Sequence, residues 1–166
     1  FRRSRKNYRT YAHYWRNLKA LIVHQIPTGA WRENCYVLKN LQNEALLVDP
    51  GGEFQQIVDV IEDSEAKLFA ILGTHAHYDH MGEVSRLKEH FSVPFYLHSK
   101  DKKLLRRANL YCKMFEGNHP IPIPTVDVYF DELERVIFFG SFSISLSFVD
   151  SISCEFFSII GNVISY

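Results

Sequence analysis

The segment Leu-Phe-Ala-Ile-Leu-Gly-Thr-His-Ala-His-Tyr-Asp-His, residues 68–80, is the most informative part of this chain. Its first five residues form a compact apolar run, which is typical of a buried strand, and Gly73 ends that run. Four residues that can bind a metal ion then follow within six positions: His75, His77, Asp79 and His80. We therefore expect a cluster of metal ligands in the loop that leaves the carboxyl end of a strand.

The spacing of these residues predicts which of them can bind the same metal ion. Side chains at i and i+2 of an extended backbone project to one side, so His75 and His77 can hold the same ion. The turn toward the next helix carries Asp79 and His80 to a neighbouring position. Imidazole and carboxylate ligands suit zinc, iron or manganese. Two such ions would share a water molecule, lower its pKa and make hydroxide available at neutral pH.

The alternative interpretation is that these side chains only end a strand. The other five histidines are scattered along the chain, so a chance cluster of this density is less consistent with the composition. We therefore favour a metal site at residues 75–80.

Three apolar, β-branched runs precede the cluster and predict an antiparallel meander. Residues 20–26 and 35–38 flank a turn-rich stretch, and residues 45–48 end at the turn sequence Asp49-Pro50-Gly51-Gly52. The spacing of Phe54, Ile57, Val58 and Ile61 then predicts an amphipathic helix.

Further elements are expected after the cluster. Val84, Leu87 and Phe91 indicate a second helix, residues 95–97 a strand, and residues from Ser99 as N-cap to about 113 a third helix. Residues 117–124 are rich in proline and should form a loop. Residues 142–148 alternate apolar and polar side chains, as a half-buried strand does, and residues 156–166 are typical of a hairpin. Strands flanked by helices make the fold class α/β.

Composition excludes several classes of protein. With 166 residues, 46% hydrophobic and 23% charged, the chain has enough apolar mass for a core and is not disordered. Three widely spaced cysteines exclude a disulfide scaffold and fit a reducing compartment, so we expect a cytoplasmic protein. No uninterrupted apolar run of about 18 residues exists, so no membrane partner is expected.

Charge is distributed unevenly along the chain. Residues 1–20 contain seven of the 19 basic residues and none of the 19 acidic ones. We expect residues 1–19 to form a basic N-terminal extension, disordered or partly helical, and residues 20–166 to form the domain. Because the rest of the chain is acidic overall, we expect neither a nucleic-acid partner nor nuclease activity.

From about residue 21 onward the sequence resembles the metallo-β-lactamase superfamily, and most closely its glyoxalase II-like hydrolases (hydroxyacylglutathione hydrolases). The resemblance rests on Ile26-Pro27-Thr28-Gly29, Asn34-Cys35-Tyr36-Val37-Leu38, the turn at residues 48–52, the histidine cluster and the helix after Gly82. It implies an αββα sandwich, of which this chain holds the N-terminal part. It also implies a dinuclear metal hydrolase that cleaves a small-molecule thioester or ester, such as S-lactoylglutathione.

The resemblance also implies roles for individual residues. His75 and His77 would bind the first metal, and Asp79 and His80 the second. Asp79 would in addition act in catalysis by orienting the nucleophile, a metal-bound hydroxide. Asp49 would support the site from the end of its strand. Zinc is the expected metal at two sites, with iron or manganese as alternatives, and the residues that bind substrate are unknown.

The chain departs from the family pattern downstream of the cluster. The family places a third histidine of the first metal near residues 149–153, where Ser151 stands, and its bridging aspartate and last histidine would lie beyond Tyr166. The alternative function is therefore a truncated or degenerate, non-catalytic module for metal binding or interaction. Such a module could form oligomers through its C-terminal strands.

Two other features leave alternatives open. Lys100, Lys102, Lys103, Arg106 and Arg107 form a basic run that is either a solvated helix face or a site for a carboxylate or phosphate of the substrate. Tyr78 either hydrogen-bonds a substrate or packs beside the metals.

Overall fold

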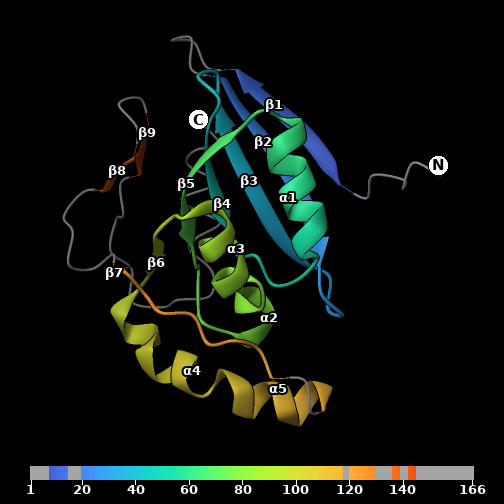
Figure 1. The fold of residues 1–166 in the computed structure, drawn as a ribbon, viewed down its shortest axis with the longest axis vertical. Helices are drawn as coiled ribbons and strands as arrows, with labels where there is room; N and C mark the ends of the chain where they lie inside the picture. Colours follow the sequence, from blue (N-terminus) through green and yellow to red (C-terminus); the bar gives the residue numbers. More distant parts are fainter. Residues whose placement is uncertain (1–7, 15–19, 118–119, 130–135, 139–141, 145–166) are drawn as a thin grey trace.

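A mixed seven-stranded sheet forms the centre of the molecule (Figure 1). The computed structural model describes residues 8–14, 20–117, 120–129, 136–138 and 142–144. The strands follow one another in the sheet in sequence order: β1 (Arg9–Tyr14), β2 (Ala20–Thr28), β3 (Glu33–Asn40), β4 (Glu44–Val48), β5 (Lys67–Leu72), β6 (Phe95–Leu97) and β7 (Val128–Tyr129). A separate antiparallel pair joins β8 (Val136–Phe138) and β9 (Phe142–Ile144).

The direction of pairing changes at β4. Strands β1 to β4 pair antiparallel, as the predicted meander requires, whereas β4 to β7 pair parallel. Four of the five residues of β4 are buried, so this strand is covered on both faces. Such burial is typical of parallel strands, and it explains the unbroken apolar runs of β4 and β5.

Parallel neighbours need crossover connections, and helices provide them. They are α1 (Phe54–Asp63), α2 (Tyr78–Met81), α3 (Val84–Phe91), the 3-10 turn η1 (Ser99–Asp101), α4 (Lys102–Arg106) and α5 (Ala108–Glu116). Figure 1 shows α1 and α3 over one face of the sheet, with α4 and α5 beyond its lower end. Ile57 and Ile61 of α1 and Leu87 of α3 join Val37 and Leu47 of the sheet in one buried core. The predicted α/β class is confirmed.

Two sequence-based expectations need correction. Residues 9–14 are neither disordered nor helical, because β1 pairs with β2 from Arg9 to Tyr14. The predicted third helix is interrupted at Arg107, and its N-cap is His98 instead of Ser99, since the His98 ring accepts a hydrogen bond from the Lys100 backbone N–H at 3.1 Å.

The segment that follows α5 returns along two helices. The Asn109 side chain bonds both the N–H and the carbonyl of Ile121, and the Ser85 hydroxyl donates to the Pro122 carbonyl at 3.0 Å. Among the helices that the structure describes, none has the length and apolar character needed to span a bilayer. The expected hairpin at residues 156–166, Ser151 and the end of the strand expected at 142–148 lie outside the described residues.

Candidate metal centre

The predicted ligands lie on two loops at one edge of the sheet. Because β4 and β5 are parallel neighbours, their carboxyl ends meet at the same edge. Asp49 follows β4, and residues 74–77 follow β5. The Asp49 backbone N–H donates to the Leu72 carbonyl at 3.0 Å, which joins the two loops at their start.

Glycine lets these loops come closer than any other residue would. A Cβ atom on Gly51 would lie 1.6 Å from the backbone oxygen of Asp79, and one on Gly82 would lie 2.2 Å from the Gly51 oxygen. The Glu83 N–H also donates to the Pro50 carbonyl at 2.9 Å. The turn after β4 is thus fitted directly against α2, which carries Asp79 and His80.

Asp49 links the two loops through its side chain. Its carboxylate accepts hydrogen bonds from the Thr74 N–H at 2.7 Å and from the Thr74 hydroxyl. Its Oδ2 atom lies 3.1 Å from Nδ1 of His80, and the residue is 4% exposed. The supporting position expected for Asp49 agrees with these contacts, and its role toward a metal remains a prediction.

His75 and His77 converge as their i, i+2 spacing predicts. Nε2 of His75 faces Nδ1 of His77 at 2.8 Å, and Nδ1 of His75 faces the Thr74 hydroxyl at 2.9 Å. Burial, with the neighbouring His80 and His77, lowers the pKa of His75 to about 4. The His75 ring is therefore neutral at physiological pH, which is the state that a metal ligand requires.

His80 also packs against His75. The ring centroids of His75 and His80 are 4.2 Å apart, and ligand atoms of Asp49, His75 and His80 all lie within 4.8 Å of one another. His77 and Asp79 are outside this group, and the Asp79 carboxylate is 4.0 Å from the His80 ring nitrogen Nε2. The four predicted ligands thus share one region, and His75 contacts a member of each expected pair, His77 and His80.

The donor set fits a divalent metal ion. His80 Nδ1 is buried and has no aligned hydrogen-bond partner among the described residues, despite its proximity to Asp49. Burial acts to lower the pKa of His80, but the nearby carboxylates of Asp49 and Asp79 outweigh it and raise that pKa. Imidazole nitrogens and carboxylate oxygens at these positions are the ligands that zinc, iron and manganese prefer.

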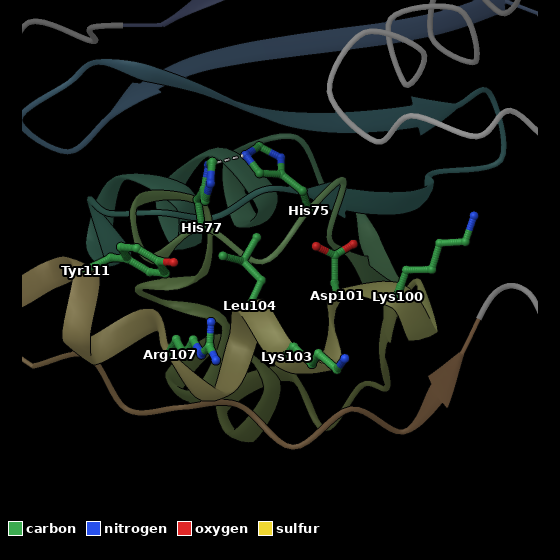
Figure 2. A pocket seen from close by; sticks show the side chains of 8 residues that line it. All are labelled: His75, His77, Lys100, Asp101, Lys103, Leu104, Arg107 and Tyr111. Carbon is green, nitrogen blue, oxygen red and sulfur yellow. Dashed lines mark hydrogen bonds between the residues drawn. The ribbon is translucent and has the colours of Figure 1, made fainter.

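A cavity of about 400 Å³ opens beside His75 and His77. In Figure 2 the two imidazoles lie at its upper edge, Leu104 and Asp101 in the middle, and Lys103 and Arg107 at the lower edge. Tyr111 and Lys100 complete the lining on either side. The volume is within the usual range for a small-molecule site.

Asp101 lies within the third helix expected from the sequence, and no sequence pattern marked it as part of the site. It is 2% exposed, and its Oδ1 accepts from the backbone N–H of Ala76, between the two histidines, at 3.3 Å. Burial raises the pKa of its carboxyl group. The signal available in the sequence was an aspartate four residues after a short apolar strand, and nothing local connects it to residue 76.

Tyr78 packs between α2 and α5. It is buried against Ala108 and Cys112, and its hydroxyl accepts a hydrogen bond from Trp31 Nε1 at 3.1 Å. The apolar contact with Ala108 and Cys112 holds α2 against α5, so Tyr78 joins the ligand-bearing helix to the helices across the cavity.

Comparison with solved structures supports the same fold. The BLEG-1 B3 metallo-beta-lactamase is 34% identical, with a TM-score of 0.65 over 73% of this chain and 58% of that one. A di-iron-bound form of TTHA1623 is 33% identical, with a TM-score of 0.56 over 63% of this chain and 51% of that one.

Sequence comparison also finds the hydroxyacylglutathione hydrolase GloC of Haemophilus influenzae, 31% identical over 63% of this chain and 47% of that protein. The chain spans about half the length of the curated relatives it matches. The family model of the metallo-beta-lactamase superfamily matches residues 28–149. The chain thus has the N-terminal part of that fold and belongs to the metallo-beta-lactamase superfamily.

Proposed function

We propose that this chain supplies the histidine-rich half of a metal-dependent hydrolase site, and that the reaction is glyoxalase II-like hydrolysis of a small-molecule thioester or ester. The observation that carries the proposal is the convergence of His75, His77 and His80 beside Asp49 at the edge of a cavity. The similarity to a protein named hydroxyacylglutathione hydrolase favours a thioester over other hydrolysable groups.

Each residue has a defined part in this proposal. His75 and His77 would hold one ion, since their nitrogens already face each other, and Asp79 and His80 would hold a second. Zinc is the proposed metal, with iron or manganese as alternatives. When bound, such ions lower the pKa of a water molecule and polarise a carbonyl group. Asp79 would orient the attacking water, while Asp49 fixes Thr74 and the start of the ligand loop.

The cavity supplies the second requirement of a hydrolase, which is a place for the substrate. Because His75 and His77 line it, a ligand within it lies against the proposed metal ligands. Leu104 offers an apolar surface between the imidazoles and the cationic edge, which suits the uncharged chain of a thioester.

Metal content and hydrolysis, measured on the same samples, test the proposal. The chain would be purified without chelator, analysed for metal and assayed with S-lactoylglutathione, beside a His75→Ala/His77→Ala variant. His90→Gln serves as the matched control, because His90 lies on α3 against Phe54 and Phe91, away from the cluster. We expect about two equivalents of metal in the wild type and in His90→Gln, and loss of metal and of hydrolysis in the double variant.

The two readouts separate the proposal from its alternative. Bound metal without turnover at any metal loading would contradict the hydrolase and leave a non-catalytic metal-binding module. Only traces of metal in the wild type would contradict the hydrolase and a metal-binding module, and would leave a non-catalytic interaction module.

A further inference from the structure

The loop after β5, residues 73–77, leaves the sheet between two parallel neighbours. In the sheet β5 lies between β4 and β6, and all three strands run in the same direction. The segments that follow β4 and β6 therefore leave at the same edge, one on either side of this loop. The Gly73 N–H donates to the Tyr96 carbonyl at 2.9 Å, so the loop begins directly beside β6. Residues that follow β6 are thus as well placed to hold the loop as Asp49, which follows β4.

Asp101 is the residue after β6 that reaches this loop. It ends η1, and its Oδ1 atom accepts the Ala76 N–H at 3.3 Å. On the other side, Asp49 accepts the Thr74 N–H at 2.7 Å, and both aspartates are buried. Alternate residues of the loop thus donate their backbone N–H groups to two carboxylates, while the two histidines that alternate with them carry the proposed ligand side chains.

The Asp101 carboxylate does not serve its own helical segment. Asp101 directly precedes α4, yet its side chain makes no capping hydrogen bond with that helix. Its second oxygen, Oδ2, is buried and has no hydrogen-bond partner among the described residues. A buried carboxylate that is only half satisfied costs stability. In Figure 2 it points from η1 toward the two imidazoles. The loop, and not the local helix, therefore accounts for its position.

The segment that presents Asp101 is itself fixed to the sheet. Leu97, the last residue of β6, is fully buried in the core, and Leu105 of α4 joins the same core. Between them His98 caps η1 by accepting the Lys100 N–H at 3.1 Å. An acceptor on a segment that is anchored on both sides can hold the loop at a fixed distance.

We propose that Asp101 is a positioning residue of the metal centre, which together with Asp49 holds the loop so that His75 and His77 meet at one ion. The inference rests on the proposed function, because it concerns the metal that this function requires. The amide that Asp101 holds lies between the two histidines, so rotation of that peptide group would turn their side chains apart.

Competition with a chelating dye for zinc measures this role in the full chain. Asp101→Ala and Asp101→Val both remove the acceptor, and valine fills the space that alanine leaves empty. Asp101→Asn keeps an acceptor oxygen and removes only the charge. The matched control is Asp127→Ala, because the Asp127 carboxylate also accepts a backbone N–H, that of Phe95 at 2.7 Å, and its contacts are with α3 and β6.

We expect Asp101→Ala and Asp101→Val to weaken zinc binding by about tenfold or more, as the loss of groups that orient metal ligands does. Asp101→Asn should bind within about threefold of the wild type, because its amide oxygen can accept the same hydrogen bond. Asp127→Ala should leave the affinity unchanged. Co²⁺ in place of zinc gives a second readout, since its visible absorption depends on ligand geometry and should change in the alanine and valine variants of Asp101 alone.

Three results would overturn the inference. The first is zinc affinity and a Co²⁺ spectrum that neither Asp101→Ala nor Asp101→Val changes, which would leave the proposed metal site without this support. The second is an equal loss of affinity in Asp101→Asn, because the charge and not the hydrogen bond would then be responsible. The third is an equal loss in Asp127→Ala, which would show only a general loosening of the fold.

Amide hydrogen exchange of the metal-free chain keeps the two proposals apart. Asp101→Ala and Asp101→Val should speed exchange of the Ala76 amide by about tenfold or more, and Asp127→Ala should not. That result, with a wild type that binds no metal, would leave the hold of Asp101 on the loop and remove the hydrolase. Zinc binding by the wild type, with Ala76 exchange unchanged in both Asp101 variants, would do the reverse.

Discussion

The two sides of the cavity are built in different ways. We call them the histidine wall, lined by His75 and His77 and supported by residues 49–51 and 79, and the helical wall, lined by side chains of η1, α4 and α5. On the histidine wall, the backbone at Gly51 packs directly against the Asp79 carbonyl. The Asp49 carboxylate also accepts two hydrogen bonds from Thr74. On the opposite wall, exposed side chains of Lys103 and Arg107 extend from helices that are anchored by buried side chains and by the bonds of Asn109 to Ile121.

This difference predicts which positions tolerate amino-acid substitution. A ligand cluster needs fixed distances, and close backbone packing supplies them, so almost every substitution on the histidine wall should have a structural consequence. The cavity-facing side chains of the opposite wall are exposed or half-buried, so close packing does not fix them. The helical wall can therefore exchange its outward side chains without loss of fold, provided that its buried stripe is kept.

The largest effect is expected from Gly51→Ala. The added Cβ would lie 1.6 Å from backbone oxygen, so the turn and α2 must separate. We expect a loss of about 3 kcal/mol or more in the free energy of unfolding, measured by urea denaturation, together with loss of bound metal. In the control Gly73→Ala, the Cβ would meet side-chain atoms and no backbone: Leu97 at 2.9 Å, Met81 at 3.1 Å and Phe95 at 3.2 Å. A loss in Gly51→Ala no greater than in this control would contradict the close-packed wall.

The helical wall predicts a contrast between two adjacent leucines. Leu105 is 6% exposed and part of the core, whereas Leu104 is half-buried and lines the cavity. Leu105→Ala should cost about 2–4 kcal/mol in the free energy of unfolding, because it leaves a cavity in the core. Leu104→Ala should cost less than half as much. If parallel urea titrations gave similar losses of unfolding free energy for Leu104→Ala and Leu105→Ala, the cavity-facing side chains of the helical wall would be as important for stability as its buried ones.

Asp49→Asn examines the histidine wall without adding volume. The amide keeps the size of the carboxylate but removes the negative charge beside His80 and one acceptor for Thr74. Outer residues that orient ligands typically contribute about 10–100-fold to metal affinity. We expect a loss in that range from competition with a chelating dye, and a smaller change in stability. Unchanged affinity would remove Asp49 from the proposed site.

Local sequence patterns predicted the parts of the site that are close in the chain. The i, i+2 spacing of His75 and His77 predicted their convergence, and the apolar run before Gly73 predicted the strand that presents them. The carboxylate expected beside His80 was Asp79, its neighbour. The structure places Asp49 closer to the His80 ring, because the parallel pairing of β4 and β5 brings together residues that are far apart in sequence.

Other features had weak or no sequence signals. Composition suggested that the basic N-terminal segment lies outside the sheet, although Thr10 and the tyrosines around it are good strand formers, and β1 forms there. Neither glycine nor proline marks the break at Arg107 between α4 and α5. The sequence showed that basic residues cluster between 100 and 107. It did not show that Lys102 lies over the ring of Tyr129 while others line the cavity, because this division depends on tertiary packing.

The smallest predicted effect concerns the return segment that backs the helical wall. Burial acts to raise the pKa of Asp127, but the hydrogen bonds from Lys88 at 2.6 Å and from the Phe95 N–H at 2.7 Å outweigh it and lower that pKa. The stabilisation is therefore complete above the ordinary pKa of 3.8 and is lost as pH falls through the lower folded value. Because the Asp127 side chain is 37% exposed, less than about 1 kcal/mol is expected.

Urea midpoints measured between about pH 6 and about pH 3 check this prediction, with Asp127→Asn beside the exposed control Glu62→Gln. Only Asp127→Asn should reduce the acid dependence of stability. Metal content at neutral pH should be the same in both variants, because the contacts of Asp127 are with α3 and β6 and none is with the ligand loops. A loss of metal in Asp127→Asn would show instead that a change at α3 and β6 reaches the ligand loops, and that the histidine wall does not depend on its own backbone packing alone.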